Sequence, residues 1–232
     1  MTMTNFRPQG QGLLLAAILS CTAGPALAEA PQISYTLGAA SDYVFRGVSQ
    51  TNEDPFVFGS VNLAAGGFYV GAGAENVDFG NSIDFEYDLW AGWTTKLGAL
   101  GLDLGLVRYG YHDQPAGVEI DTLEYKLALS HPLGPVNAGA AFFYTSDYFG
   151  SDDSGTYAEL NASYSVNEQW SVSGAYGKQD VGTGLDYATW NLGLGWAASK
   201  LVSADLRYHD TDAHEAGAIL DSRVVGTIKL SF

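Results

Sequence analysis

Three acidic residues at alternate positions, Asp84, Glu86 and Asp88, form the most suggestive charged pattern in the chain. They lie in IDFEYDLWAGWTTKL (residues 83–97), where the intervening positions from Ile83 are mostly apolar or aromatic. Successive side chains of a β-strand point to opposite faces, so this segment is predicted to be a strand with one apolar and one acidic face. The chemistry that such a row offers is electrostatic: it raises the local concentration of cations.

The remaining histidines, serines and acids of the sequence give little indication of catalysis. The stretch HDTDAHE (residues 209–215) contains metal-ligand types close together, but we expect a solvated acidic loop there. No G-x-S-x-G, phosphate-binding loop or C-x-x-C motif occurs, and no spacing singles out a Ser–His pair. We therefore predict that the protein is not an enzyme and has no cofactor and no metal site.

The elements that position these acids are predicted to be about twelve strands of roughly ten residues each. No helical period follows residue 28. The strands are roughly twice the usual ~5–6 residues and match the ~9–11 residues that cross a bilayer at a tilt. The expected ranges are 33–45, 56–64, 68–77, 83–97, 100–111, 118–130, 136–145, 156–166, 170–179, 187–198, 201–209 and 220–232.

The connections between these strands alternate in length. Those after even-numbered strands are short (AGG, LGA, PLGP, NEQ, SK), whereas most of the others are longer and acidic, such as SDYFGSDDSG. A transmembrane barrel has short periplasmic turns and longer external loops, but a soluble sandwich has no reason for that asymmetry. The predicted fold class is therefore all-β, an antiparallel transmembrane β-barrel. Aromatic residues near the strand ends suit interfacial girdles: Trp93, Tyr144, Trp170, Trp190, Trp196 and Tyr208.

The first 28 residues are predicted to be a secretory signal peptide, followed by the barrel over residues 29–232. Arg7 precedes an apolar run from Leu13 to Leu19, and Ala26-Leu27-Ala28 forms a cleavage site. Ile18-Leu19-Ser20-Cys21 offers the alternative of a lipoprotein cut before Cys21. Cleavage after Ala28 removes the single cysteine and Arg7, leaving nine basic and 26 acidic residues, a net charge of −17 instead of −16. That charge argues against a nucleic-acid partner.

Residues 41–51, SDYVFRGVSQT, and 67–93, GFYVGAGAENVDFGNSIDFEYDLWAGW, resemble the signature of the TorF family of putative porins. The resemblance covers about the first half of the mature chain and continues mainly as barrel rhythm. It implies an outer-membrane barrel with a presumed channel role, and it supplies no substrate. The terminal Phe232 resembles the C-terminal aromatic residue by which outer-membrane barrels are recognised for assembly.

Charged residues on the predicted lumen faces are the candidate pore-lining groups. Asp42 and Arg46 are expected at the outer end of the first strand, either as a charged constriction or as an ion-pair network that braces the barrel. Arg108 would face lipid if alternation were strict, so we expect a bulge near Leu106-Val107. The full set of selectivity candidates is Asp42, Arg46, Glu75, Asp84, Glu86, Asp88, Glu124, Glu159, Asp205, Arg207 and Arg223.

The function expected from sequence is passive diffusion of small hydrophilic solutes through the cell outer membrane, with a weak preference for cations. The alternative is a non-conducting structural or adhesive barrel with a braced charged interior. A third reading is a periplasmic or lipidated β-protein that binds a ligand. Expected partners are outer-membrane lipid and lipopolysaccharide, small hydrophilic solutes, and the barrel-assembly machinery through Phe232.

Overall fold

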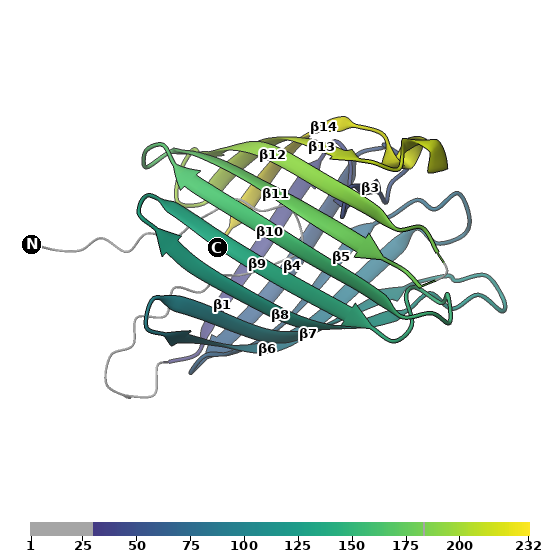
Figure 1. The fold of residues 1–232 in the computed structure, drawn as a ribbon, viewed down its shortest axis with the longest axis horizontal. Helices are drawn as coiled ribbons and strands as arrows, with labels where there is room; N and C mark the ends of the chain where they lie inside the picture. The colour runs from purple at the N-terminus through teal and green to yellow at the C-terminus, as the bar shows by residue number, and fades with distance from the viewer. Residues whose placement is uncertain (1–29, 183) are drawn as a thin grey trace, which may run out of the picture.

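A computed structural model of the chain describes residues 30–182 and 184–232. It forms a closed antiparallel β-barrel of twelve long strands, seen from the side in Figure 1. This confirms the predicted fold class and strand number. The predicted signal peptide, with its lipoprotein alternative, lies outside the described residues.

The long strands follow the predicted ranges closely, with each pairing to its neighbour along the chain. They are β1 (Gln32–Ala40), β4 (Phe56–Ala65), β5 (Phe68–Asn76), β6 (Phe85–Leu97), β7 (Leu100–Tyr111), β8 (Thr122–Leu133), β9 (Val136–Thr145), β10 (Gly155–Ser165), β11 (Trp170–Asp180), β12 (Tyr187–Ala197), β13 (Val202–Thr211) and β14 (Arg223–Ser231).

The first and last strands close the barrel. β1 pairs with β14 from Thr36↔Ser231 to Ala40↔Thr227. Beyond that ladder, Tyr35 and Phe232 exchange two backbone hydrogen bonds, with N···O distances of 3.2 and 2.9 Å. The sheet therefore has no free edge, which is the condition for placing strands in lipid.

The outer surface of the barrel is apolar. Leu160 is 66% exposed, and Leu192 and Ile228 are each 61% exposed, all on outward-facing positions of their strands. An apolar belt of this extent marks a surface that lies against lipid rather than water. The exposed Trp170 and Trp196 stack across β11 and β12, with ring centroids 6.0 Å apart. They lie near the end of the barrel that carries the short turns, here named the turn end, as expected for an interfacial girdle.

The loop asymmetry predicted from sequence is present. All longer connections, residues 41–55, 77–84, 112–121, 146–154, 181–186 and 212–222, lie at one end of the barrel, here named the loop end. The last of these contains two 3-10 helices, η1 (His214–Ala216) and η2 (Ala218–Leu220). Within the described ranges, no helix is long and apolar enough to cross a membrane.

The structure corrects three details of the prediction. The first strand ends at Ala40 rather than at residue 45. β6 begins at Phe85, so Asp84 is an exposed loop residue, and Ile83 is buried inside instead of facing lipid. β7 has no bulge: its register with β6 runs unbroken from Leu97↔Leu100 to Glu86↔Tyr111.

Arg108 tolerates its outward position because it lies near the loop end, only three residues before the end of β7. Its guanidinium pairs with Asp121 at 2.6 Å while its side chain remains 45% exposed. A charge at that depth costs far less than one at the bilayer midplane. The bulge was therefore unnecessary.

The two faces of β10 provide a test of the barrel register. Leu160→Lys places a charge on the lipid face near the middle of the strand, and it should destabilise the folded barrel by ~2–4 kcal/mol. Asn161→Lys is the matched control, because Asn161 lies on the lumen face and donates to the Glu159 carboxylate at 2.9 Å. Urea unfolding in detergent or lipid measures both. Equal losses of stability would contradict the assigned faces.

Candidate constriction in the barrel lumen

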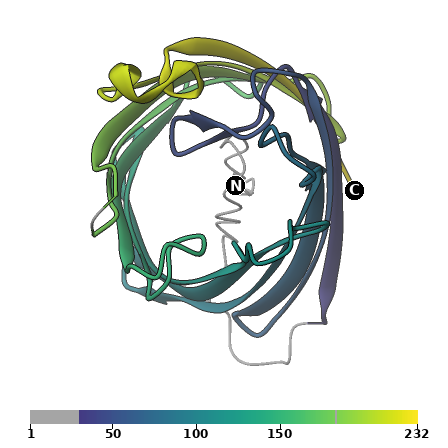
Figure 2. The same cartoon turned by 90° about the vertical axis from the view of Figure 1, so that its right-hand side faces the viewer.

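Residues 41–55, here named the inserted segment, fold from the end of β1 into the barrel instead of extending outward (Figure 2). They contain a small hairpin of β2 (Val44–Phe45) and β3 (Val48–Ser49). The two residues of its turn, Arg46 and Gly47, both have positive φ, 50° and 87°. A two-residue hairpin turn with positive φ at both positions has the backbone twist that matches paired strands.

Asp42 holds the inserted segment together and attaches it to the barrel wall. The Asp42 carboxylate accepts hydrogen bonds from Ser49 Oγ at 2.7 Å and Thr51 Oγ1 at 3.0 Å. It also pairs with Arg223 at the start of β14 at 2.9 Å. Asp42 therefore serves as a structural anchor within the lumen.

Gly47 allows the hairpin turn to lie close against β12 and β13. A β-carbon at this position would collide with the side chains of Thr189 on β12 and Thr211 on β13. Only glycine combines the positive φ with this close approach. The turn thus rests directly on the lumen wall.

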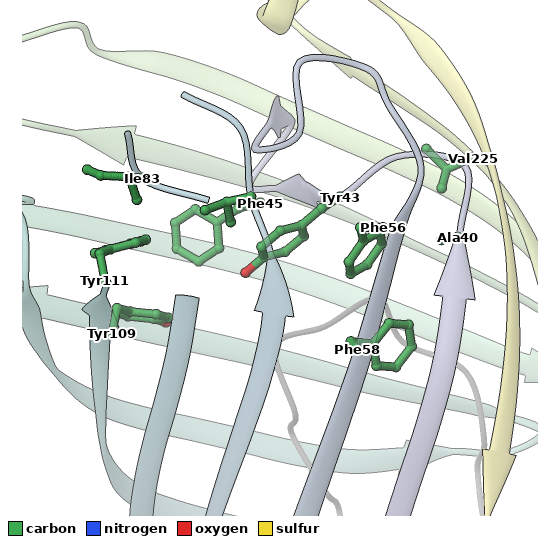
Figure 3. Close-up of a cluster of buried hydrophobic side chains, with 10 residues drawn as sticks. Ala40, Tyr43, Phe45, Phe56, Phe58, Ile83, Tyr109, Tyr111 and Val225 are labelled. Atoms are coloured by element: carbon green, nitrogen blue, oxygen red, sulfur yellow. The ribbon is translucent and has the colours of Figure 1, made fainter. Parts of the chain in front are cut away.

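Aromatic side chains fill the loop-end half of the lumen around the inserted segment (Figure 3). Tyr43 stacks on Phe56 with ring centroids 4.9 Å apart. Phe45 packs edge-on against Tyr109 of β7 at 5.6 Å and against Phe149 of the 146–154 loop at 6.0 Å. The core of this barrel is therefore inside its lumen, and the inserted segment is part of it.

Arg46 carries a buried positive charge across the lumen. Its guanidinium nitrogens donate to both oxygens of Glu124 on β8, at 2.8 and 2.6 Å, and to Gln179 of β11 at 3.0 Å. The side chains of Arg46 and Glu124 are only 1% and 2% exposed. A two-pronged pair of this kind fixes both distance and orientation.

The surroundings of Arg46 come from the wall opposite its own strand. Its guanidinium lies over the rings of Phe143 on β9 at 5.0 Å and Tyr157 on β10 at 4.4 Å. β10 is separated from β1 by several strands in either direction around the ring. The inserted segment therefore spans the lumen, and Arg46 joins it to the far wall.

Two further charged groups line the lumen toward the turn end. On one wall, Lys126 pairs with Asp103 at 2.7 Å, and Tyr69 donates to the same carboxylate at 2.7 Å. On the opposite wall, Arg207 binds Asp205 at 3.0 Å and Asn191 at 2.6 Å. β7, which carries Asp103, and β13, which carries Arg207, are six strands apart in the ring of twelve, so the two groups lie on opposite walls.

Space remains between the inserted segment and the wall formed by β10 to β14. One cavity of about 100 Å³ is lined by both polar and apolar residues, among them Arg46, Glu159 and Asn191. A second of about 40 Å³ lies on the other side of Val44 and includes Asp205 and Lys229 in its lining. Val44, Arg207 and His209 belong to both linings. Each cavity exceeds the volume that a water molecule requires.

Three carboxylates gather on the β5–β6 wall beside Tyr43. One oxygen from each of Glu75, Glu86 and Asp88 lies within 4.8 Å of the others. Tyr43 donates its hydroxyl to Glu86 Oε1 at 3.4 Å. Burial, followed by the nearby Glu86 carboxylate, raises the pKa of the Tyr43 phenol, so Tyr43 keeps the proton that it donates.

The eleven residues predicted to line a pore therefore fall into different environments. Arg46 and Glu124 form the buried bridge, and Asp42 and Arg223 anchor the inserted segment. Glu75, Glu86 and Asp88 form the acidic cluster, whereas Glu159, Asp205 and Arg207 lie along the cavities. Asp84 joins none of these groups, because β6, which was expected to hold it on the lumen face, begins only at Phe85.

The side chains of the HDTDAHE stretch are divided between the two faces of the barrel wall. His209 faces the cavities, whereas Asp210 lies on the outer side of β13, where it pairs with His214 at 2.7 Å and accepts from Tyr208 at 2.8 Å. The first three residues of the stretch belong to β13 rather than to a loop.

Sequence reasoning missed several residues that build the constriction. If Asp42 and Arg46 faced the lumen of a continuous first strand, alternation would place Tyr43 and Phe45 on its lipid face, and neither Gln179 nor Tyr157 stood out. The signal that was available is the unusual spacing in SDYVFRG: Ser41-Asp42 and Arg46-Gly47 favour turns and interrupt a continuous strand. A prediction from the alternation of apolar residues alone continued the first strand through these turn residues.

A family model described as "Bacterial protein of unknown function (Gcw_chp)" matches residues 25–231, and the chain belongs to this family. No curated protein matches it. The family that matches does not carry the TorF name, so membership of the TorF family stays a prediction; the barrel fold that the resemblance implies agrees with the structural relatives below.

The barrel is similar to solved structures of outer-membrane channels. The KdgM porin shares 9% identity at a TM-score of 0.61, covering 86% of this chain and 98% of the porin. The NanC porin shares 10% identity at a TM-score of 0.54, with 86% and 98% coverage. The COG4313 outer membrane channel from Pseudomonas putida F1 shares 14% identity at a TM-score of 0.54, covering 90% and 96%. At these identities, the likeness shows the fold alone.

The buried bridge should contribute far more to stability than an ion pair of the same length outside. Arg46→Ala leaves Glu124 buried without its partner and should lower the free energy of unfolding by about 3–5 kcal/mol. Arg108→Ala breaks the pair with Asp121, also 2.6 Å long, in which the arginine is 45% exposed; the loss should be at most about 1 kcal/mol, because Asp121 keeps hydrogen bonds from Tyr111 N–H and Gln114. Denaturant unfolding of both variants in one detergent checks the difference. Similar losses would mean that the inserted segment is not held by Arg46.

Proposed function

We propose that this member of the family is an outer-membrane, porin-like channel for passive diffusion of small hydrophilic solutes. The observation that carries the proposal is a closed, lipid-compatible barrel whose lumen retains polar cavities beside an inserted segment. Transmembrane barrels of more than eight strands have interiors wider than wall side chains alone can fill. The inserted segment would narrow that interior to a selective passage.

The passage that we propose runs between the inserted segment and the β10–β14 wall. Its lining contains Glu159, Asn161, Asn191 and Arg207, which offer both donors and acceptors to a hydrated solute. The opposite side of the inserted segment is packed with aromatic rings and is an unsuitable route for polar molecules. Small solute size follows from the modest cavity volumes.

We further propose that the channel weakly prefers cations, because its loop end is strongly acidic. The six longer connections contain one lysine or arginine, Arg46, which is buried. Exposed acids there include Glu53, Asp113, Glu119, Asp152 and Glu215. Arg207 and Lys229 oppose the preference deeper inside. We therefore assign the preference mainly to the entrance, to which the exposed Asp84 of the 77–84 connection also belongs, whereas Glu86 is buried beside Tyr43.

A non-conducting, braced barrel is the second candidate, and one observation favours it. Arg46 joins the inserted segment to Glu124 and Gln179 on the far wall, which blocks part of the cross-section with buried side chains. A barrel that serves envelope integrity or adhesion would benefit from such bracing. Conductance distinguishes the two candidates.

Localisation and assembly complete the proposal. The apolar exterior supports residence in the cell outer membrane among lipid and lipopolysaccharide, and Phe232 at the end of the closing strand supports recognition by the barrel-assembly machinery. The resemblance of SDYVFRGVSQT to the TorF signature supports membership in that group of porins. The acidic net charge supports the absence of a nucleic-acid partner. The barrel architecture supports a role without catalysis.

Planar-bilayer recording tests the channel directly. The wild-type barrel should conduct, and a double variant, Arg46→Ser with Glu124→Ser, should conduct more because it shortens both bridging side chains without leaving a lone buried charge. Arg108→Ser removes a half-exposed guanidinium on the outer side of β7 and should leave conductance unchanged. Absence of conductance in every variant would favour the braced barrel. Equal conductance in all of them would place the constriction elsewhere.

Reversal potentials in a salt gradient test the cation preference. We expect a weak cation preference at low salt that fades near 1 M, where the screening length falls to ~3 Å. Glu119→Gln, Asp152→Asn and Glu215→Gln together should reduce it. Glu168→Gln, in the turn at the other end of the barrel, is the control and should change it less. Anion preference in the wild type would contradict an acidic entrance as the determinant.

A further inference from the structure

The cluster of Glu75, Glu86 and Asp88 has more negative charge than its surroundings neutralise. Glu75 and Glu86 are directly opposite each other on β5 and β6, a placement in which like charges destabilise a sheet. Among the described residues, no lysine, arginine or histidine forms an ion pair with any of the three. The two other buried acids of the constriction, Asp42 and Glu124, each pair with an arginine.

Two oxygens of the cluster are buried without a hydrogen-bond partner. They are Glu86 Oε2 and Asp88 Oδ1. Glu86 is only 1% exposed, so bulk water does not satisfy its oxygen. A buried carboxylate oxygen left without a donor is costly, and it calls for an explanation such as a bound ion.

The spacing of the three carboxylates suits a hard divalent cation. Two oxygens bound to one Ca²⁺ at 2.3–2.6 Å lie at most about 5 Å apart. The three oxygens here lie within 4.8 Å of one another. Calcium accepts carboxylates in irregular geometry and completes its shell with water or hydroxyl oxygens, whereas Mg²⁺ demands near-octahedral geometry and releases its water reluctantly. The buried, irregular cluster therefore fits calcium better.

We propose that Glu75, Glu86 and Asp88 bind a calcium ion that stabilises the inserted segment inside the lumen. The link to that segment is Tyr43, which donates to Glu86 Oε1 at 3.4 Å and stacks on Phe56 at 4.9 Å. Neutralising Glu75 and Glu86 removes their repulsion and fixes the wall on which Tyr43 rests. The sequence reading expected no metal site, because it counted these acids as separate pore-lining groups. The proposal does not depend on conduction.

Isothermal titration of Ca²⁺ into the full-length mature barrel, refolded in non-ionic detergent and freed of metal by chelation, tests the site. We expect one calcium per barrel with a Kd of about 10⁻⁴–10⁻³ M, the range of extracellular calcium modules. Calcium should also raise the thermal unfolding temperature of the barrel, because a ligand that binds only the folded state stabilises it. Mg²⁺ should bind more weakly.

Two variants and one control make the test specific. Glu86→Gln and Asp88→Asn keep the side-chain shapes and should each weaken calcium binding by at least about tenfold. Without calcium, each should be at least as heat-stable as the wild type, because it removes a repulsive charge; a group with only a structural role would show a loss. Glu159→Gln changes a lumen acid on β10 outside the cluster and should leave calcium binding unchanged.

Three results would overturn the proposal. The first is the absence of a calcium-dependent heat or of a shift in unfolding temperature in the wild type. That result would mean that a proton shared between the carboxyl groups, and no calcium ion, satisfies the two oxygens. The second is equal calcium affinity in the wild type and Glu86→Gln, which would place the ion on the acidic loops. The third is equal loss in Glu159→Gln and Glu86→Gln. None of these results bears on conductance, which tests the channel separately.

Discussion

The backbone hydrogen bonds of a strand in lipid have no water to satisfy them, and the rest of this structure follows from that constraint. Twelve strands pair in a ring, and β1 meets β14 so that no edge remains. Closure assigns each side chain to one of two environments, because successive residues face opposite sides. Outward residues such as Leu160 meet lipid, and inward residues such as Glu159 meet the lumen.

A ring of twelve strands encloses more space than its wall side chains fill, and the inserted segment occupies the loop-end part of that space. Its entry buries Arg46, which is tolerable only because Glu124 and Gln179 supply partners and three aromatic rings surround the guanidinium. Because an unpaired Arg46 or Glu124 would be costly in this buried position, their pairing determines where the inserted segment lies. The same pairing rule governs Lys126 with Asp103 and Arg207 with Asp205. Glu75, Glu86 and Asp88 are the group that departs from it, and that departure is the reason to assign them a cation.

The division of the lumen into a packed side and an open side has a functional meaning. Aromatic residues and the acidic cluster occupy the side of β5 to β7, whereas the cavities lie along β10 to β14. In the channel that we propose, a solute that passes the inserted segment would meet Asn161, Asn191 and Arg207 rather than the acids beside Tyr43. In the same proposal, the acidic loops would act on ions earlier, at the entrance, where salt screens their field.

The amino-acid sequence by itself determined the barrel class, the number of strands, the lipid and lumen faces of most strands, and the end that carries the long loops. Period-two alternation and turn residues are local signals, and they place strand ends within four residues everywhere except the first strand. Only the tertiary structure decided that residues 41–55 fold inward, that Arg108 needs no bulge, and that Arg46 meets Glu124, 78 residues away. It also brought Glu75 beside Glu86 and left Asp84 outside. These outcomes depend on ring closure and on which buried charges pair across the lumen. Such pairs join residues that are distant in the chain, so no local sequence pattern predicts them.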